Sequence, residues 1–500
     1  MSPDPGTIDL TRTIADVLVS EATAGRIGAS LAKTLAGVAG IAAFSVPAMA
    51  RLILPPPKET RLADHLPLDQ LQADGRTIVC RDGTLVQCIV LEGRDIMFLS
   101  AEERDSLFRI RKNWLDAIAE IGVTVRVMLM RERVSAARSD DLSNPVLKEI
   151  ARRWNRSFQE AFANRQVIVL STPGKSRAAA GKLAEAVDIT LQTLAPYQPR
   201  VMYQTEGQPQ VPPPPEHLLA FWGALTSPIS RPVPHGRQGQ VSDVIATDTI
   251  EFTGERGVIR FSRGPQEMFC AAIGIRRFGD HVDEQMISDF SGLDGEMVLL
   301  HLIEPWSKTM AAMRMTQEKN MSLATRLSQT AGSQYDDAID IIEGLDENRA
   351  AMATYSMVLF LFCRTTAELD ALDTEVRKIC SAYGAASVRE GAAAQASWFS
   401  LFPSYSIWPR AYRFFSSNIA TNITLDRPPT GTPRCDWGDG PLSMFRTAGG
   451  TSYSFQLHVS ADKDAVGHAV CIGPTGSGKT TVISFLAGMD MRHPKLRTFI

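Results

Sequence analysis

The sequence has no pair of cysteines at C-x-x-C spacing, and its seven cysteines are widely separated and odd in number. This distribution argues against a disulfide framework or a zinc ribbon and indicates a reducing compartment. The eight histidines include no H-E-x-x-H or comparable metal-binding spacing. Internal repeats at solenoid periods are also missing. The chain is therefore expected to fold around an ordinary hydrophobic core.

The sequence also lacks a charge excess of either sign, with 52 Lys and Arg against 55 Asp and Glu and a formal charge of −3. Such a chain has no global field that attracts nucleic acid, so any such contact must be local. Two basic clusters are candidates, Arg109, Arg111 and Lys112 and then Arg152, Arg153 and Arg156. They are interpreted either as solvated helix faces or as a patch for acidic lipid or nucleic acid. Direct binding of nucleic acid stays open.

No secretory signal occupies the first two dozen residues, which are mixed and polar. The longest uncharged run, 34–50, lies between Lys33 and Arg51 and continues as an apolar stretch to residue 54. It is at the short edge of spanning length and is weakly hydrophobic. Two interpretations remain: helices that pack on the body or on a partner, or a membrane-associated segment over 34–54. Pro55–Pro57 separates this region from the rest.

With 500 residues and 44% hydrophobic composition, the chain is long enough for two to four domains. Alternating strand and helix patterns from about residue 60 predict an α/β protein, with N-terminal α+β domains followed by the start of a further domain. The predicted divisions are an N-terminal helical segment over 1–57, an αβ domain over 58–208, a proline-rich linker over 209–240, a second αβ domain over 241–427, and the start of the P-loop domain over 428–500.

Individual elements follow from periodicity and turn signals. Strands are expected over 76–80, 84–91, 123–130, 166–171, 251–252, 257–261, 269–275, 297–303 and 353–363, and helices over 103–121, 177–194 and 366–382. A Met-rich helix is expected over about 305–332. Val146, Ile150, Trp154, Phe158 and Phe162 recur every four residues, which predicts the core stripe of a helix. The aromatic-rich segment 398–415 is expected to pack against the P-loop domain, and stacking on nucleic acid is the alternative.

One motif carries chemistry. Residues 473–480 read G-P-T-G-S-G-K-T and fit the phosphate-binding loop G-x-x-x-x-G-K-[ST] at every fixed position. An apolar run over 469–472 precedes the loop as a predicted strand, and 480–487 follows it as a predicted helix. Small residues turn backbone N–H groups inward to form a nest for phosphate oxygens, and the helix adds the positive end of its dipole. The expected ATP-binding residues are Gly473, Pro474, Thr475, Gly476, Ser477, Gly478, Lys479, Thr480 and Thr481.

Within this loop, Lys479 is expected to reach the β- and γ-phosphates as the catalytic residue, and the Thr480 hydroxyl to ligate Mg²⁺. Hydrolysis also needs an apolar strand that ends in an acid. The nearest such string upstream, 297–304, is expected to lie in another domain, and few residues follow Thr480. The last residues, 498–500, read as a strand that has only begun. The natural protein is therefore expected to be longer, and the 500-residue chain alone to lack hydrolytic activity.

Several ordered strings resemble the large VirB-type ATPases of type IV secretion and conjugation machines, the CagE/TrbE/VirB family. They are the opening Arg61–Pro67, the segment 77–93 with Asp82-Gly83, the strings Leu401–Pro403, Pro409-Arg410 and Ser417–Ala420, and the approach to the loop from Trp437 to His468. Cys435, Asp436 and Asp439 depart from the neutral, Pro-rich approach expected there. Residues 1–59 have no clear counterpart.

The resemblance implies an ATPase subunit with N-terminal α+β domains and a RecA-like P-loop domain. Such a subunit uses ATP and Mg²⁺ to drive assembly of the channel and pilus and substrate export. It further implies a homo-oligomer on the cytoplasmic face of the bacterial inner membrane, in contact with inner-membrane and other ATPase subunits. Two alternatives stay open: a non-catalytic assembly subunit with a truncated motor domain, and a DNA-pumping motor of the HerA/FtsK type. The exported substrate and the oligomer size are not predicted.

Overall fold

The computed structural model divides into two compact units, Met1–Arg61 and Leu62–Ile500. The structure describes residues 61–136, 142, 144–204, 213–234, 239–254, 256–279, 284–307, 311, 313, 351–434, 440–457 and 469–492. The uncharged N-terminal run and almost all of the Met-rich segment 305–332 lie outside these residues. Among the helices that are described, none combines the length and the hydropathy needed to cross a membrane.

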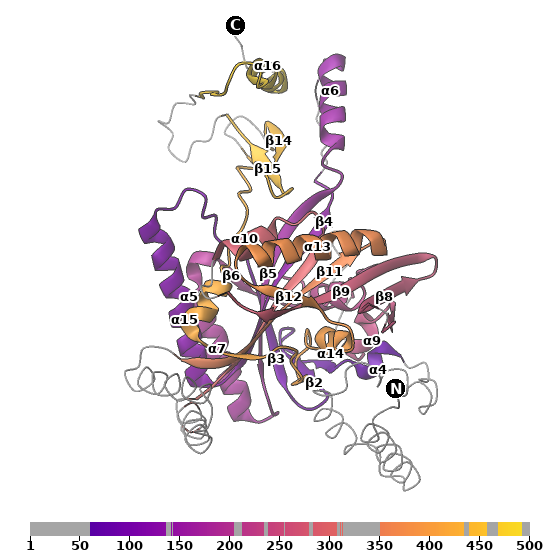
Figure 1. Ribbon diagram of the computed structural model, residues 1–500, viewed down its shortest axis with the longest axis vertical. Coiled ribbons are helices and arrows are strands. Elements are labelled where there is room, and N and C mark those ends of the chain that lie inside the picture. The colour runs from indigo at the N-terminus through magenta and orange to yellow at the C-terminus, as the bar shows by residue number, and fades with distance from the viewer. Residues whose placement is uncertain are drawn as a thin grey trace, which may run out of the picture. The chain divides into compact units, whose positions relative to one another are not determined.

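A large antiparallel sheet dominates the second unit (Figure 1), and its main path runs β1-β2-β3-β5-β4-β10-β11-β9-β8-β7. Three further strands pair with it, β6 on β3, β12 on β9 and β13 on β11. The strands are β1 (Leu68–Leu71), β2 (Ile78–Cys80), β3 (Leu85–Leu91), β4 (Thr124–Val134), β5 (Ala161–Thr172), β6 (Pro199–Val201), β7 (Thr249–Phe252), β8 (Val258–Arg263), β9 (Gln266–Arg277), β10 (Glu296–Pro305), β11 (Met352–Cys363), β12 (Ala386–Arg389) and β13 (Tyr412–Phe415). β14 (Ser443–Arg446) and β15 (Ser452–Phe455) pair with each other as a separate hairpin.

Helices cover both faces of this sheet. One face carries α5 (Ala101–Ile121), α7 (Arg177–Thr193), α10 (Glu284–Ser291), α13 (Thr366–Ala382) and α15 (Ser416–Asn422). The other carries α4 (Leu62–His65), α8 (Leu218–Thr226), α9 (Val241–Ile245) and α14 (Ala394–Phe399). The remaining helices are α6 (Pro145–Arg156), η1 (Ala195–Tyr197) and α16 (Lys479–Asp490). Alternate residues of β10 and β11 enter the two cores, which makes both strands buried throughout most of their length.

The sheet contains the same βαββαβ arrangement twice. In the first copy the elements β3, α5, β4, β5, α7 and β6 give the strand order β6-β3-β5-β4. In the second, β9, α10, β10, β11, α13 and β12 give β12-β9-β11-β10. Both are the ferredoxin-like order, and β4 pairs with β10 to join the copies into one sheet. Sequence inspection at solenoid periods did not reveal this duplication.

Most predicted elements are confirmed. The strands predicted over 76–80 and 84–91 correspond to β2 and β3, which pair as a hairpin with Gly83 at a φ of +91° in the turn. The predicted helix 103–121 is α5, which begins at a capping box of Ser100 and Glu103 and ends at Gly122 with a φ of +75°. The predicted strands 166–171, 297–303 and 353–363 lie within β5, β10 and β11.

The predicted core stripe of residues 146–162 is wrong in part. Its first three members do lie on α6, but their side chains are exposed, at 66% for Val146, 42% for Ile150 and 37% for Trp154. Phe158 follows the end of the helix, and Phe162 belongs to β5. A period of four is also produced by a helix that leaves its apolar side partly uncovered and by a strand that follows it.

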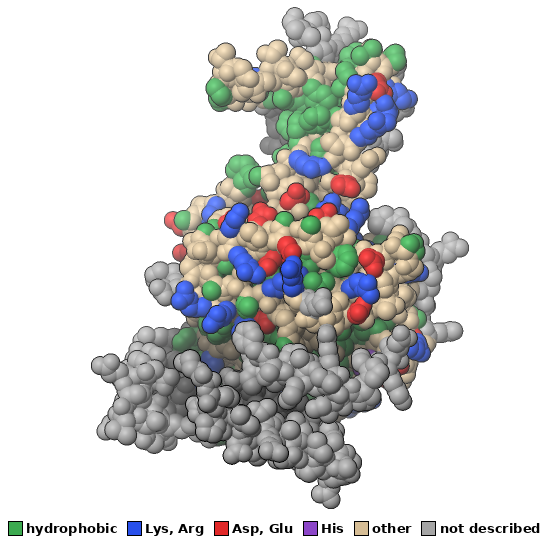
Figure 2. Space-filling model, turned by 45° about the vertical axis from the view of Figure 1, so that its right-hand side comes forward, with side chains coloured by type: hydrophobic (Ala, Val, Ile, Leu, Met, Phe, Trp, Pro, Cys, Tyr) green, Lys and Arg blue, Asp and Glu red, His purple; other side chains and the backbone are tan. Residues whose placement is uncertain are grey.

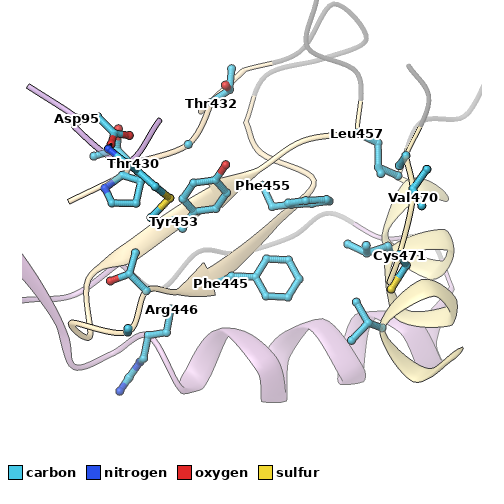
Figure 3. Close-up of a pocket in the computed structure, with 18 of the residues that line it drawn as sticks. Asp95, Thr430, Thr432, Phe445, Arg446, Tyr453, Phe455, Leu457, Val470 and Cys471 are labelled. Atoms are coloured by element: carbon cyan, nitrogen blue, oxygen red, sulfur yellow. The ribbon is translucent and has the colours of Figure 1, made fainter. Parts of the chain in front are cut away.

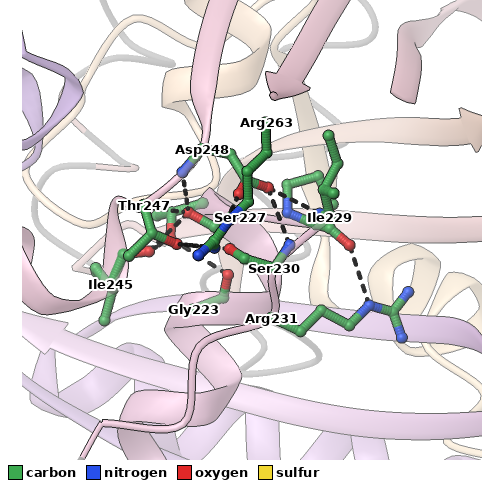
Figure 4. A network of polar contacts seen from close by, with 11 residues as sticks. Gly223, Ser227, Ile229, Ser230, Arg231, Ile245, Thr247, Asp248 and Arg263 are labelled. Atoms are coloured by element: carbon green, nitrogen blue, oxygen red, sulfur yellow. Dashed lines mark hydrogen bonds and ion pairs between the residues drawn. The ribbon is translucent and has the colours of Figure 1, made fainter. Parts of the chain in front are cut away.

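The stretch expected as a proline-rich linker, 209–240, contains the buried helix α8. Its residues are apolar all round, so the period typical of a surface helix is missing from the sequence. A polar network ties the end of α8 to the strand entry after α9 (Figure 4). Ser227 Oγ donates to Ile245 O and accepts from the N–H groups of Thr247 and Asp248, while the Asp248 carboxylate accepts from Ile229 N at 2.8 Å.

The aromatic-rich segment 398–415 packs in the large sheet, and not against the phosphate-loop region as predicted. Trp398 and Phe402 are fully buried on the α8 face, where Trp398 contacts Phe261 of β8 and Phe402 stacks on Trp222. Phe414 lies on the opposite side and stacks on Tyr355 at 5.4 Å. Composition shows that such a segment is buried, but not against which partner.

Candidate functional site

The glycine-rich loop lies immediately before α16 and has the backbone that its sequence requires. Gly476 and Gly478 have φ values of +82° and +83°, which residues with a Cβ rarely adopt. At Gly473, a Cβ atom would lie 2.8 Å from Ser477 Oγ. The presence of glycine at these three positions therefore has a local explanation. The loop is a compact turn that leads directly into the N-terminus of α16.

Lys479 folds back over this turn. Its Nζ donates to the carbonyl oxygens of Gly473 at 2.9 Å and Pro474 at 2.8 Å. The loop carbonyls thus hold the ammonium group above the turn, where an incoming phosphate would compete for it. Thr480 and Thr481 lie in the first turn of α16, and both are exposed. The nine predicted binding residues, 473–481, are thus brought together in one exposed loop and helix start.

The predicted strand over 469–472 is not formed among the described residues. Val470 and Ile472 are 84% and 89% exposed, and neither pairs with any described strand. A strand needs a hydrogen-bonding neighbour, which an apolar sequence run cannot supply by itself. The predicted helix after the loop is confirmed as α16.

The described residues contain no group of three or more His, Cys, Asp or Glu side chains that could hold a metal ion. The upstream acidic string ends at Glu304, which lies in β10 of the large sheet, as expected for another part of the fold. The Mg²⁺ ligand expected at Thr480 stays a prediction.

The β14–β15 hairpin and α6 support α16. Leu442, Met489, Leu142 and Ala151 form a small buried cluster, with Leu147, Phe455 and Phe485 packed around it. The Arg492 guanidinium donates to Pro441 O at 2.8 Å and ties the end of α16 to the start of the hairpin. The loop is therefore exposed, but the helix behind it is anchored.

A cavity of about 920 Å³ lies beside α16. Figure 3 shows the rings of Phe445, Tyr453 and Phe455 on the hairpin side and Val470 and Cys471 beside the helix. None of residues 473–480 lines it, so it is a feature distinct from the phosphate loop. Sequence reasoning missed this cavity, because its walls come from four separate segments.

The predicted basic clusters do not form a common patch. Arg111 is buried and donates to Tyr197 OH at 2.9 Å and to Ala420 O at 3.0 Å, with Glu284 as its carboxylate partner. On α6, the Glu149 carboxylate accepts from both Arg152 and Arg153, and these contacts lower the pKa of Glu149 to about 2. Figure 2 shows basic and acidic side chains interspersed over the body of the second unit, with a denser basic group on α6.

Two segments of the large sheet match known protein families. Residues 216–410 match the family described as "CagE, TrbE, VirB family, component of type IV transporter system". Residues 76–177 match the family described as "Type IV secretion system ATPase VirB4/TrbE, N-terminal domain". The chain belongs to the VirB4/TrbE family. These two matches cover most of both ferredoxin-like copies of the sheet.

Curated relatives agree with this assignment. The chain is 22% identical over 262 residues to the type IV secretion system protein virB4 of Bartonella quintana (strain Toulouse), covering 52% of this chain and 32% of that protein. It is 24% identical over 253 residues to protein virB4 of Agrobacterium fabrum (strain C58 / ATCC 33970), covering 50% and 31%. It is 29% identical over 179 residues to conjugal transfer protein TrbE of Rhizobium radiobacter, covering 35% and 21%. The virB4 matches span about a third of those relatives' length.

Proposed function

We propose that this VirB4/TrbE-family chain is the ATP-binding subunit of a type IV secretion or conjugal transfer apparatus and that residues 473–481 bind ATP. The observation that carries the proposal is the loop itself: two glycines at positive φ, a third whose Cβ would lie 2.8 Å from Ser477 Oγ, and Lys479 folded over the turn. Family membership supports the same conclusion, since the matched family is one of secretion ATPases.

The chain's own groups divide the work of binding. Backbone N–H groups around Gly476 and Gly478 form the concave surface for phosphate oxygens. Lys479 exchanges its two carbonyl contacts for phosphate oxygens, which are stronger partners because they carry charge. In this proposal the Thr480 hydroxyl oxygen ligates Mg²⁺. When bound, ATP with Mg²⁺ supplies the phosphoryl-transfer chemistry.

We further propose that the protein works as a homo-oligomer on the cytoplasmic face of the bacterial inner membrane, with the large sheet in contact with membrane and other ATPase subunits. Coupling of hydrolysis to channel and pilus assembly and to export belongs to this proposal. Support comes from the curated relatives, which are named as secretion and conjugal transfer proteins. Segment 34–54 remains a candidate for membrane association and lies outside the described residues.

Replacing Lys479 by Ala tests the assignment of the loop. We expect binding of a fluorescent ATP analogue to weaken by about a hundredfold, because the variant loses a charge-assisted contact to phosphate. Lys175 provides the control. It precedes a serine in the sequence T-P-G-K-S over 172–176, between β5 and α7, but Val169 stands where the motif requires its first glycine. Lys175→Ala should therefore leave binding unchanged. Equal binding by Lys479→Ala and the unmodified protein would overturn the proposal.

A further inference from the structure

The first ferredoxin-like copy reaches the phosphate-loop helix through Trp154, on the α6 insertion between β4 and β5. The indole lies 4.9 Å, ring centroid to centroid, from Phe485 of α16 and 5.7 Å from Phe445 of β14. It also contacts Phe158 at 6.2 Å. These separations are typical of favourable aromatic pairs. A single side chain therefore joins the large sheet's insertion, the hairpin and the phosphate-loop helix.

The indole is fixed in orientation as well as in place. Its Nε1–H donates to Met444 O of the hairpin at 2.8 Å. The hairpin is held to β5 from its other side, since Phe162 N donates to Gly450 O at 3.3 Å and Arg446 donates to Ser157 O and Glu160 O. The hairpin and α6 therefore form one support at the end of β4 and β5, and α16 rests on it.

A second contact restricts the distance between α6 and α16. At Gly488, inside α16, a Cβ atom would lie 2.9 Å from Leu147 Cδ2 of α6. Glycine in a helix interior costs about 1 kcal/mol relative to alanine, so this residue is unfavourable for the helix itself. Because Leu147 Cδ2 is the end of a flexible side chain, a larger residue here would displace that methyl group, and the contact shows that α6 and α16 pack closely at this point.

We propose that Trp154 is a positioning residue for the ATP loop: with the Leu147–Gly488 contact, it fixes the direction of α16 and so links the loop to β4 and β5 of the large sheet. This inference rests on the proposed ATP binding at residues 473–481. Because α16 begins directly after the loop, tilting the helix moves Gly478, Lys479 and Thr480 together. Trp154 touches no phosphate and acts only through the helix.

Trp154→Ala and Trp154→Phe, in the protein at the length its own cell produces, test the role. The Ala variant should bind a fluorescent ATP analogue about tenfold more weakly. The Phe variant keeps an aromatic ring and should stay within about threefold of the unmodified protein. Trp408→Ala is the matched control, since Trp408 is partly buried and also donates to a backbone carbonyl, Tyr405 O at 3.1 Å, but packs on the α8 face of the sheet.

Hydrogen exchange separates positioning from general destabilisation. In Trp154→Ala, faster amide exchange should be confined to 443–455 and 479–490, while α7 and α13 keep their protection. Uniform loss of protection, or unchanged ATP binding in Trp154→Ala, would overturn the inference. If Lys479→Ala also left binding unchanged, the proposed function would fail too. If Lys479→Ala lost binding as expected, only the role of Trp154 would fail.

A paired substitution tests the same contact without removing an aromatic ring. Gly488→Val adds a side chain against Leu147, yet valine is no worse a helix former than glycine. We expect Gly488→Val to weaken ATP binding about fivefold, and addition of Leu147→Ala to restore most of it. Failure of the double variant to recover binding, with Gly488→Val still weakened, would mean that the helices do not control the loop through this contact.

Discussion

Two arginines illustrate how single residues bind this fold together. Arg131 of β4 is buried and donates to Leu293 O at 2.7 Å, Ser291 O at 2.9 Å and Gly449 O, while its guanidinium lies 4.1 Å from the centre of the Phe162 ring. It thus joins the first copy, the loop before β10 and the hairpin near the ATP loop. Arg126 lies on the same strand but faces the opposite side of the sheet, where it donates to Ser400 O at 3.0 Å. Burial lowers the pKa of each to about 10, so both stay charged at neutral pH.

Asp426 is the partly buried acid with the clearest consequence for pH. Burial raises its pKa from 3.8 to about 7, an effect that Glu284 adds to and that Arg111 and Arg104 oppose. Because the pKa in the folded state lies above that of the unfolded chain, the folded protein binds more protons between these two values. The contribution of Asp426 to the free energy of unfolding therefore falls as pH rises through this window, by at most about 1.4 kcal/mol per pH unit.

We predict that Asp426→Asn makes the free energy of unfolding rise more steeply with pH between about 4 and 6.5 than in the unmodified protein. His301 causes the opposite slope in the same window, because burial lowers its pKa from 6.5 to about 3 and the unfolded chain then binds more protons. Removing Asp426 leaves the His301 slope unopposed. Urea unfolding at half-unit pH steps measures both proteins, and parallel curves would contradict the prediction.

At the scale of elements, what the sequence predicts well is local. The N-termini of α5, α7 and α13 are encoded by the N-cap residues Ser100, Ser176 and Thr365, whose side chains accept from backbone N–H groups of the first turn. The phosphate loop was predictable for the same reason, since Gly476 and Gly478 adopt positive φ values that favour glycine whatever the rest of the fold. The expected domain boundaries have no such local signal and stay predictions.

The elements that escaped prediction depend on distant partners. Helix α8 has no polar side because the sheet and α9 surround it, and α6 shows a core-like stripe although that stripe is partly exposed. Residues 469–472 have strand composition but no described strand beside them. Periodicity records how a segment divides apolar from polar residues, and these three cases differ in what the rest of the chain places against them.

We predict that Ser100→Ala lowers the free energy of unfolding by about 1 kcal/mol, because the Ser100 side chain accepts from Glu103 N at 3.2 Å and closes the capping box of α5. Ser106→Ala is the matched control, since Ser106 is exposed inside the same helix and alanine is the better helix former. Urea unfolding of the two variants should therefore give opposite signs or a clear difference. Equal stability of both would mean that the cap contributes nothing.

At the scale of the whole described unit, the duplicated copies share one sheet and two cores, and sequence inspection could not show this. Each strand's pattern specifies which residues are buried, but not which strand lies beside it. The joining pair is β4 with β10, where Leu129 lies opposite Leu299 and Val127 opposite His301. Buried residues of both copies belong to the same clusters on each face. From this sharing we expect the two copies to unfold cooperatively.

Truncating the joining pair tests that cooperativity. Leu299 is fully buried, so Leu299→Ala should lower the free energy of unfolding by about 2–5 kcal/mol. Because the lost contacts belong to both copies, hydrogen exchange should accelerate together in α7 of the first copy and α13 of the second. Ile407→Ala removes the same number of carbon atoms from a side chain that is 72% exposed, and should change neither. Acceleration in α13 alone would show that the copies unfold independently and that the continuous sheet does not make them one folding unit.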